Sequence, residues 1–325
     1  MKQITRNLIT YSAEIHASVE ELDNRRPHFT TLGDHQRVSS GFVNVIPDQD
    51  ARVLKVPGGW AICLREDSKA VPASEVNKAA AEKAEQVQKA TGHKPGKKEI
   101  KEIKADVIHD LLPRAFARQK LTYILYSERT QRLFVNTNSQ KSADAAMTAL
   151  VHALESVKTS TVHVSEPKLG LTARLKNWLN HADEEDCFGP MEPYAEAVLK
   201  DSDRKWAIKA ETLRSAENAL KEAIEKRARI DSIGFMHESG VTFRITDTLR
   251  VKGVKHRVVE DEEDADINHC WVSQLASEIR TLDEIFDDIL HLLSPEKAQA
   301  DKQAEVEAEE AQQVDDLYED LGNLF

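Results

Sequence analysis

The stretch His109–Gln119, with the sequence HDLLPRAFARQ, stands where the hydrophobic pattern of the chain changes. The residues before it, Lys97–Leu112, carry apolar side chains at helical spacing and predict an amphipathic helix. Pro113 must break or kink that helix, because proline has no N–H to donate and its ring clashes with the preceding turn. Leu121–Tyr126 then reads as a strand. The stretch therefore joins a helix to a strand, and its two arginines and one phenylalanine suit a polyanion or a partner subunit.

Upstream of this stretch, the sequence predicts a second helix that pairs with the first. Ser74 is a good N-cap for a helix over 75–90, which is rich in Ala, Glu, Lys and Gln, and Gly92 suits its C-terminal end. Only a short loop separates the two helices, so we expect a protruding antiparallel helical hairpin with a basic tip over 93–98. Residues 1–72 read as strands, with a Pro-Gly-Gly hairpin signal at 57–59.

Downstream, two strand-rich units and one long helix follow. The first unit has a strand pair over 121–137 and a helix over 142–157. The second has a helix over 211–227 and a strand meander over 230–254. From Trp271 to Leu293, apolar residues recur at intervals of three and four, which predicts an amphipathic helix that must bury one face.

Together these patterns predict an α+β fold with several small antiparallel or mixed sheets and helices, rather than an alternating βαβα series. We expect five regions. They are an N-terminal β-rich region over 1–72, the basic helical hairpin with the LLPRAF segment over 73–120, an α+β region over 121–199, a second α+β region with the amphipathic helix over 200–294, and an acidic tail over 295–325.

The net charge of −12 hides an uneven distribution along the chain. Residues 260–325 contain 21 acidic and 3 basic residues, a net charge of −18, which leaves +6 for residues 1–259. Within that part, 78–132 carries +6 (13 basic, 7 acidic) and 200–257 carries +5 (14 basic, 9 acidic). The chain therefore has two basic zones followed by one acidic block, and its overall charge does not exclude a nucleic-acid partner.

The sequence gives no positive support for an enzyme, a metal site or a cofactor. Its three cysteines lack the spacing of zinc ligands: Cys63, Cys187 and Cys270. The segment TGHKPGKK at 91–98 resembles a P-loop, but it has one residue too few between its glycines, and Lys98 replaces the Ser or Thr that would hold magnesium. Acid-x-Lys triplets such as Glu-Ile-Lys at 99–101 arise by chance in a chain so rich in Glu and Lys.

No apolar run approaches the roughly 18 residues that a membrane helix needs. The N-terminal residues alternate between polar and apolar and lack the apolar core of a signal peptide. We therefore expect a cytoplasmic protein without a membrane partner.

Clustered cations are the stronger functional signal. Phosphate binding needs positive charge without strict spacing, because its free energy comes largely from counterion release. The first basic zone supplies the candidate DNA-binding residues Lys94, Lys97, Lys98, Lys101, Arg114 and Arg118. The second zone supplies Lys209. The alternative is an ordinary solvated helix face, since acidic residues are interleaved at 99, 102 and 106.

Two further segments are candidates for protein contacts. Phe116 follows the helix break between two arginines, so it is either a core residue or an apolar plug at a subunit contact. The C-terminal segment is acidic and closes on an aromatic residue, similar to the docking peptides of bacterial single-strand-binding proteins. Its candidate docking residues are Asp316, Tyr318, Leu324 and Phe325. The alternative for this segment is a solubilising tail.

The LLPRAF residues 111–116, placed after a lysine-rich helix, resemble the signature of the RdgC family of recombination-associated proteins. Other stretches are similar in order and spacing: NLITY at 7–11, SGFV at 40–43, KAVPASEV at 69–76, the Lys-x-x-x-Leu segment at 209–213, and Ala-Asp at 265–266 before the amphipathic helix. The resemblance covers about 1–293, and it is diffuse outside LLPRAF.

This resemblance implies a non-enzymatic protein that binds duplex DNA with little sequence preference. It implies a horseshoe-like protomer that forms a ring-shaped homodimer around DNA, associates with the nucleoid, and limits the access of a RecA-type recombinase. The LLPRAF region would then lie near a dimer contact, with Phe116, Leu112 and Pro113 as its candidate residues. The main alternative is an interaction protein of the recombination machinery that acts through its acidic tail.

The sequence departs from the family pattern at three places that bear on DNA affinity. His93 stands at the hairpin tip, where a basic residue is usual, and it is largely neutral at pH 7. Ala210 and Glu211 follow Lys209, where the family tends to be basic or polar. The acidic extension after Ser294 goes beyond the usual family end.

Overall fold

The computed structural model describes residues 3–16, 18–25, 28–47, 52–154, 158–161, 167–180, 187–256 and 266–293. Its strands are β1 (Asn7–Glu14), β2 (Val38–Val43), β3 (Val53–Val56), β4 (Gly59–Lys69), β5 (Ala117–Ser127), β6 (Arg132–Asn136), β7 (Lys158–Thr161), β8 (Met191–Lys200), β9 (Lys205–Lys209), β10 (Arg229–His237), β11 (Thr242–Thr246) and β12 (Val251–Lys255). Its helices are α1 (Val19–Arg25), α2 (Ala73–Thr91), α3 (Lys97–Leu111), α4 (Gln140–Leu154), α5 (Pro167–Asn180), α6 (Glu217–Glu225) and α7 (Ile267–Leu293), with short 3-10 turns η1 (Leu112–Arg114) and η2 (Leu213–Ala216). No helix among these residues is both long and apolar enough to cross a membrane.

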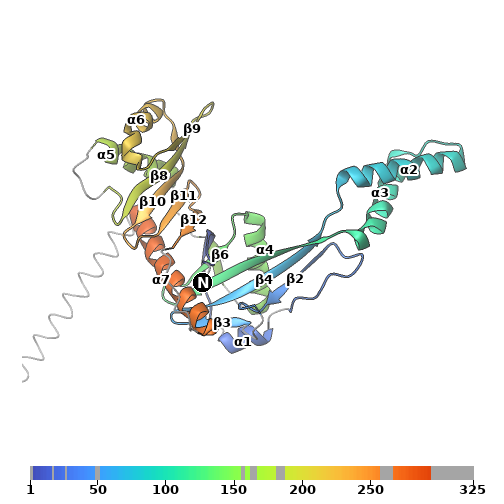
Figure 1. The fold of residues 1–325 in the computed structure, drawn as a ribbon, viewed down its shortest axis with the longest axis horizontal. Helices are drawn as coiled ribbons and strands as arrows, with labels where there is room; N and C mark the ends of the chain where they lie inside the picture. Colours follow the sequence, from blue (N-terminus) through green and yellow to red (C-terminus); the bar gives the residue numbers. More distant parts are fainter. Residues whose placement is uncertain are drawn as a thin grey trace, which may run out of the picture.

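The strands form one continuous twelve-stranded sheet, so the α+β class is confirmed but the expectation of several small sheets is wrong. The strand order is β2-β4-β5-β6-β1-β12-β11-β10-β8-β9, with β3 also on β4 and β7 also on β1. Every pairing between these strands is antiparallel. Figure 1 shows the sheet bending so that its two ends rise on the same side of the molecule.

The N-terminal strand β1 joins the two halves of the sheet. It pairs with β6 over Leu8–Ser12 on one edge, and on the other edge it meets β12 through Asn7↔Lys252 and Leu8↔Val251. Alternating patterns and turn signals reveal strands that are neighbours in sequence, as in the confirmed hairpin at Gly58. They carry no signal for a pairing between residues about 245 positions apart, which explains the incorrect expectation of separate sheets.

Two hydrophobic clusters lie on opposite faces of the first half of the sheet. One cluster contains the apolar faces of α1 and α4 with Ile9, Ile62 and Val135. The other contains Leu8 and Phe134 and extends through α7, α5 and α6 into the second half of the sheet. As Figure 1 shows, α7 runs along both halves. The predicted amphipathic helix therefore buries its stripe inside its own protomer, as its spacing requires.

Most predicted elements are present with small shifts at their ends. The helix predicted from Ser74 begins instead after Pro72, and the helix predicted over 211–227 starts as η2 before becoming α6. Strand β8 was missed, because Pro193 and a local irregularity interrupt its alternation.

Two buried carboxylates on α7 attach this helix to the sheet. Glu278 is fully buried and accepts hydrogen bonds from the backbone N–H groups of Ile4 (3.1 Å) and Thr5 (2.9 Å). Asp283 is 2% exposed and accepts hydrogen bonds from the hydroxyls of Ser127 and Thr130 at the β5–β6 turn. Both carboxylates satisfy donors that would otherwise be buried without a partner, which makes them structural rather than functional.

The contacts of Glu278 lead to a stability prediction. Replacing Glu278 with alanine leaves the Ile4 and Thr5 donors unsatisfied, so the free energy of unfolding should fall by about 3 kcal/mol. The exposed Glu284 on the same helix is the matched control, and its replacement by alanine should change stability by about 0.5 kcal/mol or less. Urea denaturation followed by circular dichroism measures both, and equal effects would contradict this role for Glu278.

Candidate nucleic-acid interface

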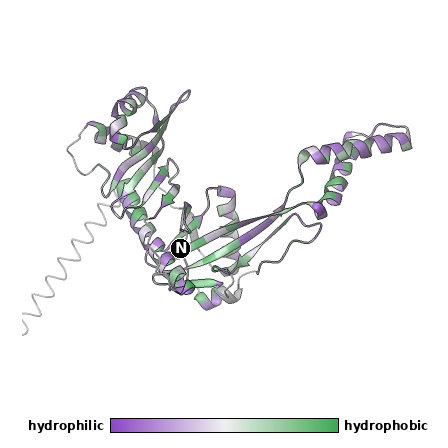
Figure 2. Cartoon of the chain, in the orientation of Figure 1, coloured by the Kyte–Doolittle hydropathy of each residue, from purple (hydrophilic) through white to green (hydrophobic). Residues whose placement is uncertain are grey.

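The lysine-rich region forms two packed helices at one end of the molecule, which we call the arm (α2 and α3, residues 73–111). The helices contact each other through a small cluster of Val76, Ala80 and Val107. The contact is small because α2 is rich in alanine and charged residues, with only two of its side chains buried. Figure 1 shows the arm beyond the ends of β4 and β5, far from α7, and Figure 2 shows many hydrophilic residues along its two helices.

Four lysines gather at the tip of the arm. Gly92 ends α2 in the left-handed conformation (φ 74°), and the Glu99 carboxylate accepts a hydrogen bond from the N–H of Gly96 (2.7 Å) at the start of α3. These interactions fix a tight connection between the helices. The following side chains are exposed, and none of them forms an ion pair with any described residue: Lys94, Lys97, Lys98 and Lys101.

The position of two of these lysines is unfavourable for the helix itself. Lys97 and Lys98 occupy the first turn of α3, where the helix dipole disfavours each positive charge by roughly 0.3–1 kcal/mol. Glu99 in the same turn has the favourable sign. An external anion at the tip would remove the unfavourable interaction of the lysines with the dipole, so their placement fits binding better than helix stability.

Phe116 lies just after the arm and is 95% exposed. It follows η1, where Pro113 ends the helix as the sequence predicts, and it precedes β5. Burying a phenylalanine contributes about 2 kcal/mol, which the isolated protomer does not gain here. Arg114 and Arg118 on either side are exposed as well.

The family resemblance also implies Leu112 and Pro113 as residues of a dimer contact, and these two residues differ in exposure. Leu112 is buried within its own protomer (4% exposed), whereas Pro113 is exposed. The first five residues of β5, 117–121, are also exposed although they pair with β4. The surface that surrounds Phe116 is therefore formed by Pro113, the two arginines and the start of β5.

A loop before β2 braces the base of the arm, a contact that sequence reasoning missed. The ring of His35 stacks on the ring of His109 with 3.9 Å between centroids, and its Nδ1 lies 3.1 Å from the His109 carbonyl oxygen. The Nζ of Lys69 donates to the carbonyl oxygens of Gly33 and Asp34 (3.2 Å each). Nothing in the sequence pattern connects positions 35 and 109, so only the fold reveals this contact.

Lys209 lies at the opposite end of the molecule from the arm. It is the last residue of β9, the terminal strand of the sheet, where exposed lysines at 205 and 209 alternate with half-buried residues. Lysines on an edge strand also discourage pairing with other chains, which is the structural alternative for Lys209. The protomer thus separates Lys209 from the arm lysines instead of bringing them together (Figure 1).

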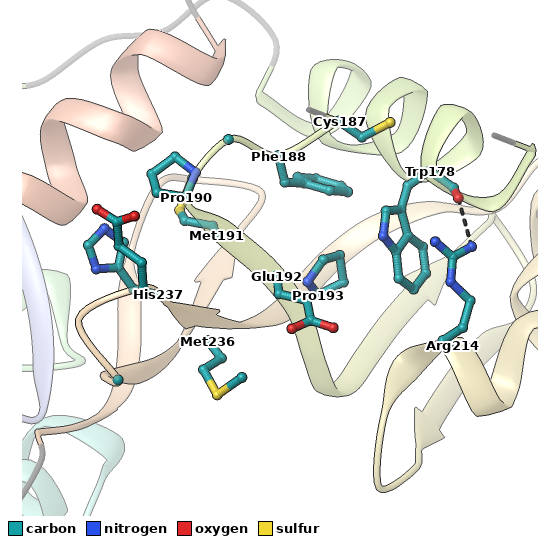
Figure 3. Close-up of a pocket in the computed structure, with 13 residues that line it drawn as sticks. Trp178, Cys187, Phe188, Pro190, Met191, Glu192, Pro193, Arg214, Met236 and His237 are labelled. Carbon is teal, nitrogen blue, oxygen red and sulfur yellow. Dashed lines mark hydrogen bonds between the residues drawn. The ribbon is translucent and has the colours of Figure 1, made fainter. Parts of the chain in front are cut away.

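Two other cations of the second basic zone, Arg214 and Lys226, have partners within the chain. The guanidinium of Arg214 lies 3.8 Å from the centre of the Trp178 ring and donates to the Trp178 carbonyl oxygen (2.8 Å). Figure 3 shows this pair at one wall of a pocket of about 480 Å³ between α5, β8 and β10. Lys226 pairs with Glu222 one helical turn away. These residues are therefore partnered inside the protomer.

The remaining expectations concern the tail and metal binding. The four candidate docking residues lie outside the described part of the chain: Asp316, Tyr318, Leu324 and Phe325. Within the described part, no three side chains of His, Cys, Asp and Glu come together as a metal site. The triplet at 99–101 lies on the exposed start of α3, where Glu99 caps the helix.

Comparison with known proteins gives one consistent result. The family model described as "Putative exonuclease, RdgC" matches residues 5–294. The recombination-associated protein RdgC of Colwellia psychrerythraea is 27% identical over 244 residues, which cover 74% of this chain and 77% of that protein. The proteins of the same name from Proteus mirabilis (24% over 275 residues, 83% and 89%) and Halorhodospira halophila (27% over 265 residues, 79% and 85%) are similar over comparable lengths.

The family match spans the arm, the LLPRAF segment, both halves of the sheet and α7. It agrees with the resemblance that the sequence motifs indicated. The chain belongs to the RdgC family.

Proposed function

We propose that this protein binds duplex DNA without sequence preference through the backbone phosphates. The observation that supports this most directly is the group of exposed lysines at the tip of the arm, which form no ion pair with a described residue and two of which are placed against the helix dipole. Binding to phosphates needs no base contacts, so it gives affinity that depends on salt and little on sequence.

We further propose that two copies enclose the duplex. In this proposal the protomer acts as a horseshoe with the arm as its protruding helical hairpin; the arm and β9 lie at opposite ends of the molecule (Figure 1). In a two-fold dimer whose axis passes through both contacts, each end meets the same end of the partner, which closes a ring from two curved protomers. Phe116, with Pro113 beside it, supplies exposed apolar surface for the contact at the arm end.

In this arrangement the protein associates with the nucleoid and limits the access of a RecA-type recombinase to duplex DNA. A ring around the duplex covers the bound DNA without altering it chemically, and this limits the access of the recombinase. The curated relatives are named recombination-associated proteins, which supports this role.

The proposed activity is binding without strand cleavage, although the family description contains the word exonuclease. Glu99, the acid of the most suggestive acid-x-Lys triplet, is engaged as a helix cap, which favours a structural role for it. Incubation of the purified protein with end-labelled duplex and Mg²⁺ separates the two activities. Progressive loss of labelled nucleotides would show that the protein hydrolyses DNA, which would contradict this proposal.

A salt titration of duplex binding tests the role of the arm. For the wild type, the logarithm of the binding constant should fall linearly with the logarithm of salt concentration, equally for unrelated sequences. Changing both Lys97 and Lys98 to glutamate should weaken binding at low salt at least about tenfold and lower the slope by about 1 for each lost phosphate contact.

The control for this titration is Lys176→Glu, a charge reversal at an exposed position of α5, at the opposite end of the molecule from the arm. It should leave affinity and slope close to the wild-type values. Fluorescence anisotropy with a random-sequence duplex measures all three proteins, and equal losses in both variants would show a general charge effect without a site at the tip.

Self-association tests the role of Phe116. Phe116→Ala should weaken the dimer about tenfold or more, because it removes exposed apolar surface that only a partner can bury. Its melting temperature at low protein concentration should stay unchanged, since the side chain has little contact within the protomer. Sedimentation equilibrium measures the dimer, with Ile267→Ala, an exposed apolar residue on α7 (61%), as the control. An unchanged dimer constant would move the contact elsewhere.

A further inference from the structure

In the second half of the sheet the strand pairing is irregular between β8 and β10 and, next to it, between β11 and β12. Residues 194–196 of β8 stand opposite the single residue Gly234 of β10. In the neighbouring pair of strands, Gly253 and Val254 of β12 stand opposite Phe243 of β11. Extra residues of this kind bend a strand and redirect its side chains, and they are frequent next to functional sites. Here they border one cleft of about 560 Å³.

The backbone around this cleft adopts conformations that are unfavourable for most residues. Ala195 has a positive φ of 61°, in the left-handed region that a non-glycine residue seldom occupies. Gly234 has no side chain, and a Cβ atom there would lie 2.3 Å from the carbonyl oxygen of Tyr194. Local strain gathered around one cleft points to a function for the cleft.

Arg244 is one of the residues that line the cleft. It is the direct register partner of Gly234, and its guanidinium lies over Gly253, where a Cβ atom would be 3.4 Å from Nη2. Its Nη1 forms an ion pair of 2.9 Å with Glu196. Gly253 leaves space beside the guanidinium, and the ion pair with Glu196 fixes one of its nitrogens.

Two more cations line the cleft, and one of them, Arg6, comes from the segment that leads into β1. Arg6 and Lys255 are exposed, and neither has an ion-pair partner among the residues described. With Arg244 the lining carries three positive charges against the single negative charge of Glu196, a net charge of +2. The cleft is therefore suited to an anion that accepts several hydrogen bonds.

We propose that this cleft binds one phosphate group of the DNA backbone in each protomer, an inference that rests on the proposed function. The planar fork of an arginine matches the oxygens of a phosphate, and Arg6 and Lys255 supply further charge at short range. The ligand is a phosphodiester and the contact is independent of base sequence, so the cleft adds affinity and fixes the position of the duplex.

The position of the cleft agrees with this assignment. The helices α5, α6 and α7 bury the apolar side chains of one face of this half of the sheet, whereas the opposite face, with Ser232, Met236 and Arg244, stays partly exposed. That opposite face continues into the face covered by α4, because β1 and β12 are paired. In Figure 1, α4 lies on the inner side of the bend, between the two ends of the protomer.

The test compares two variants of the full-length chain, which keeps the acidic residues 260–264 in place. Changing both Arg6 and Lys255 to glutamine should weaken duplex binding about tenfold and lower the salt slope by about 0.9 per protomer, the value for one phosphate. Glu196→Gln removes the competing carboxylate and should strengthen binding about threefold. Lys176→Gln, on the outer helix α5, is the matched control for loss of a cation.

A second measurement does not depend on DNA. Inorganic phosphate should raise the melting temperature of the wild type above its value in sodium chloride of equal ionic strength, because it binds only the folded cleft. The double variant at Arg6 and Lys255 should lose this increase, whereas the Lys176→Gln protein should keep it. If the wild type binds no duplex but retains the phosphate effect, the proposed function fails while the anion site stands.

Two outcomes would overturn the proposal. The first is unchanged duplex affinity and an unchanged phosphate effect in the double variant. The second concerns the acidic C-terminal segment as an alternative occupant. If deletion of 295–325 strengthens duplex binding only when Arg6 and Lys255 are present, while the phosphate effect is missing from the wild type, the cleft holds carboxylates of the chain itself.

Discussion

The attachment of α7 to the sheet is the interaction on which the rest of the fold depends. Glu278 accepts hydrogen bonds from the segment that leads into β1, Asp283 from the β5–β6 turn, and Asp288 lies 2.9 Å from the ring of His237 at the end of β10. These three acids hold three distant parts of the sheet on one helix. β1 and β12 share only two register pairs, and α7 adds a second connection between the two halves of the sheet.

The buried clusters that stabilise the fold and the candidate binding surfaces lie in different parts of the molecule. The large clusters of buried side chains lie along α7 and under α4, whereas the arm rests on its own small contact and carries a group of exposed lysines at its tip. The cleft around Arg244 follows the same division, since it opens on the face of the sheet that α7 does not cover. Charge on these surfaces can change without disturbing the packing that holds the sheet together.

Local patterns in the sequence predicted most of the elements but not their assembly. The helix break at Pro113, the turn at Gly58 and the stripe of α7 follow from residue chemistry within a few positions. The exposure of Phe116 was one of two alternatives that the sequence left open. The continuous sheet, β8 and the stacking of His35 on His109 depend on residues far apart in the chain, for which a single sequence holds no signal.

The same limit applies to the candidate site. The arm lysines were found because they are close together in the sequence. The cleft, in contrast, is lined by Arg6 and Arg244, which are far apart in the sequence. Arg214 belongs to the second basic zone by sequence, but the fold stacks it on Trp178. Charge density along a chain identifies zones, and only tertiary structure decides which of their members are free to meet a ligand.

The eleven register pairs between β4 and β5 make the arm an insertion whose dimensions are independent of the sheet. Its helices leave and re-enter on two adjacent strands, so lengthening both by seven residues would move the tip by about 10 Å without altering any core contact. The distance of the arm tip from the sheet can therefore change in steps of whole helical turns. A change in the length of the arm would thus alter the position of its lysine-bearing tip while the body of the protein stayed the same.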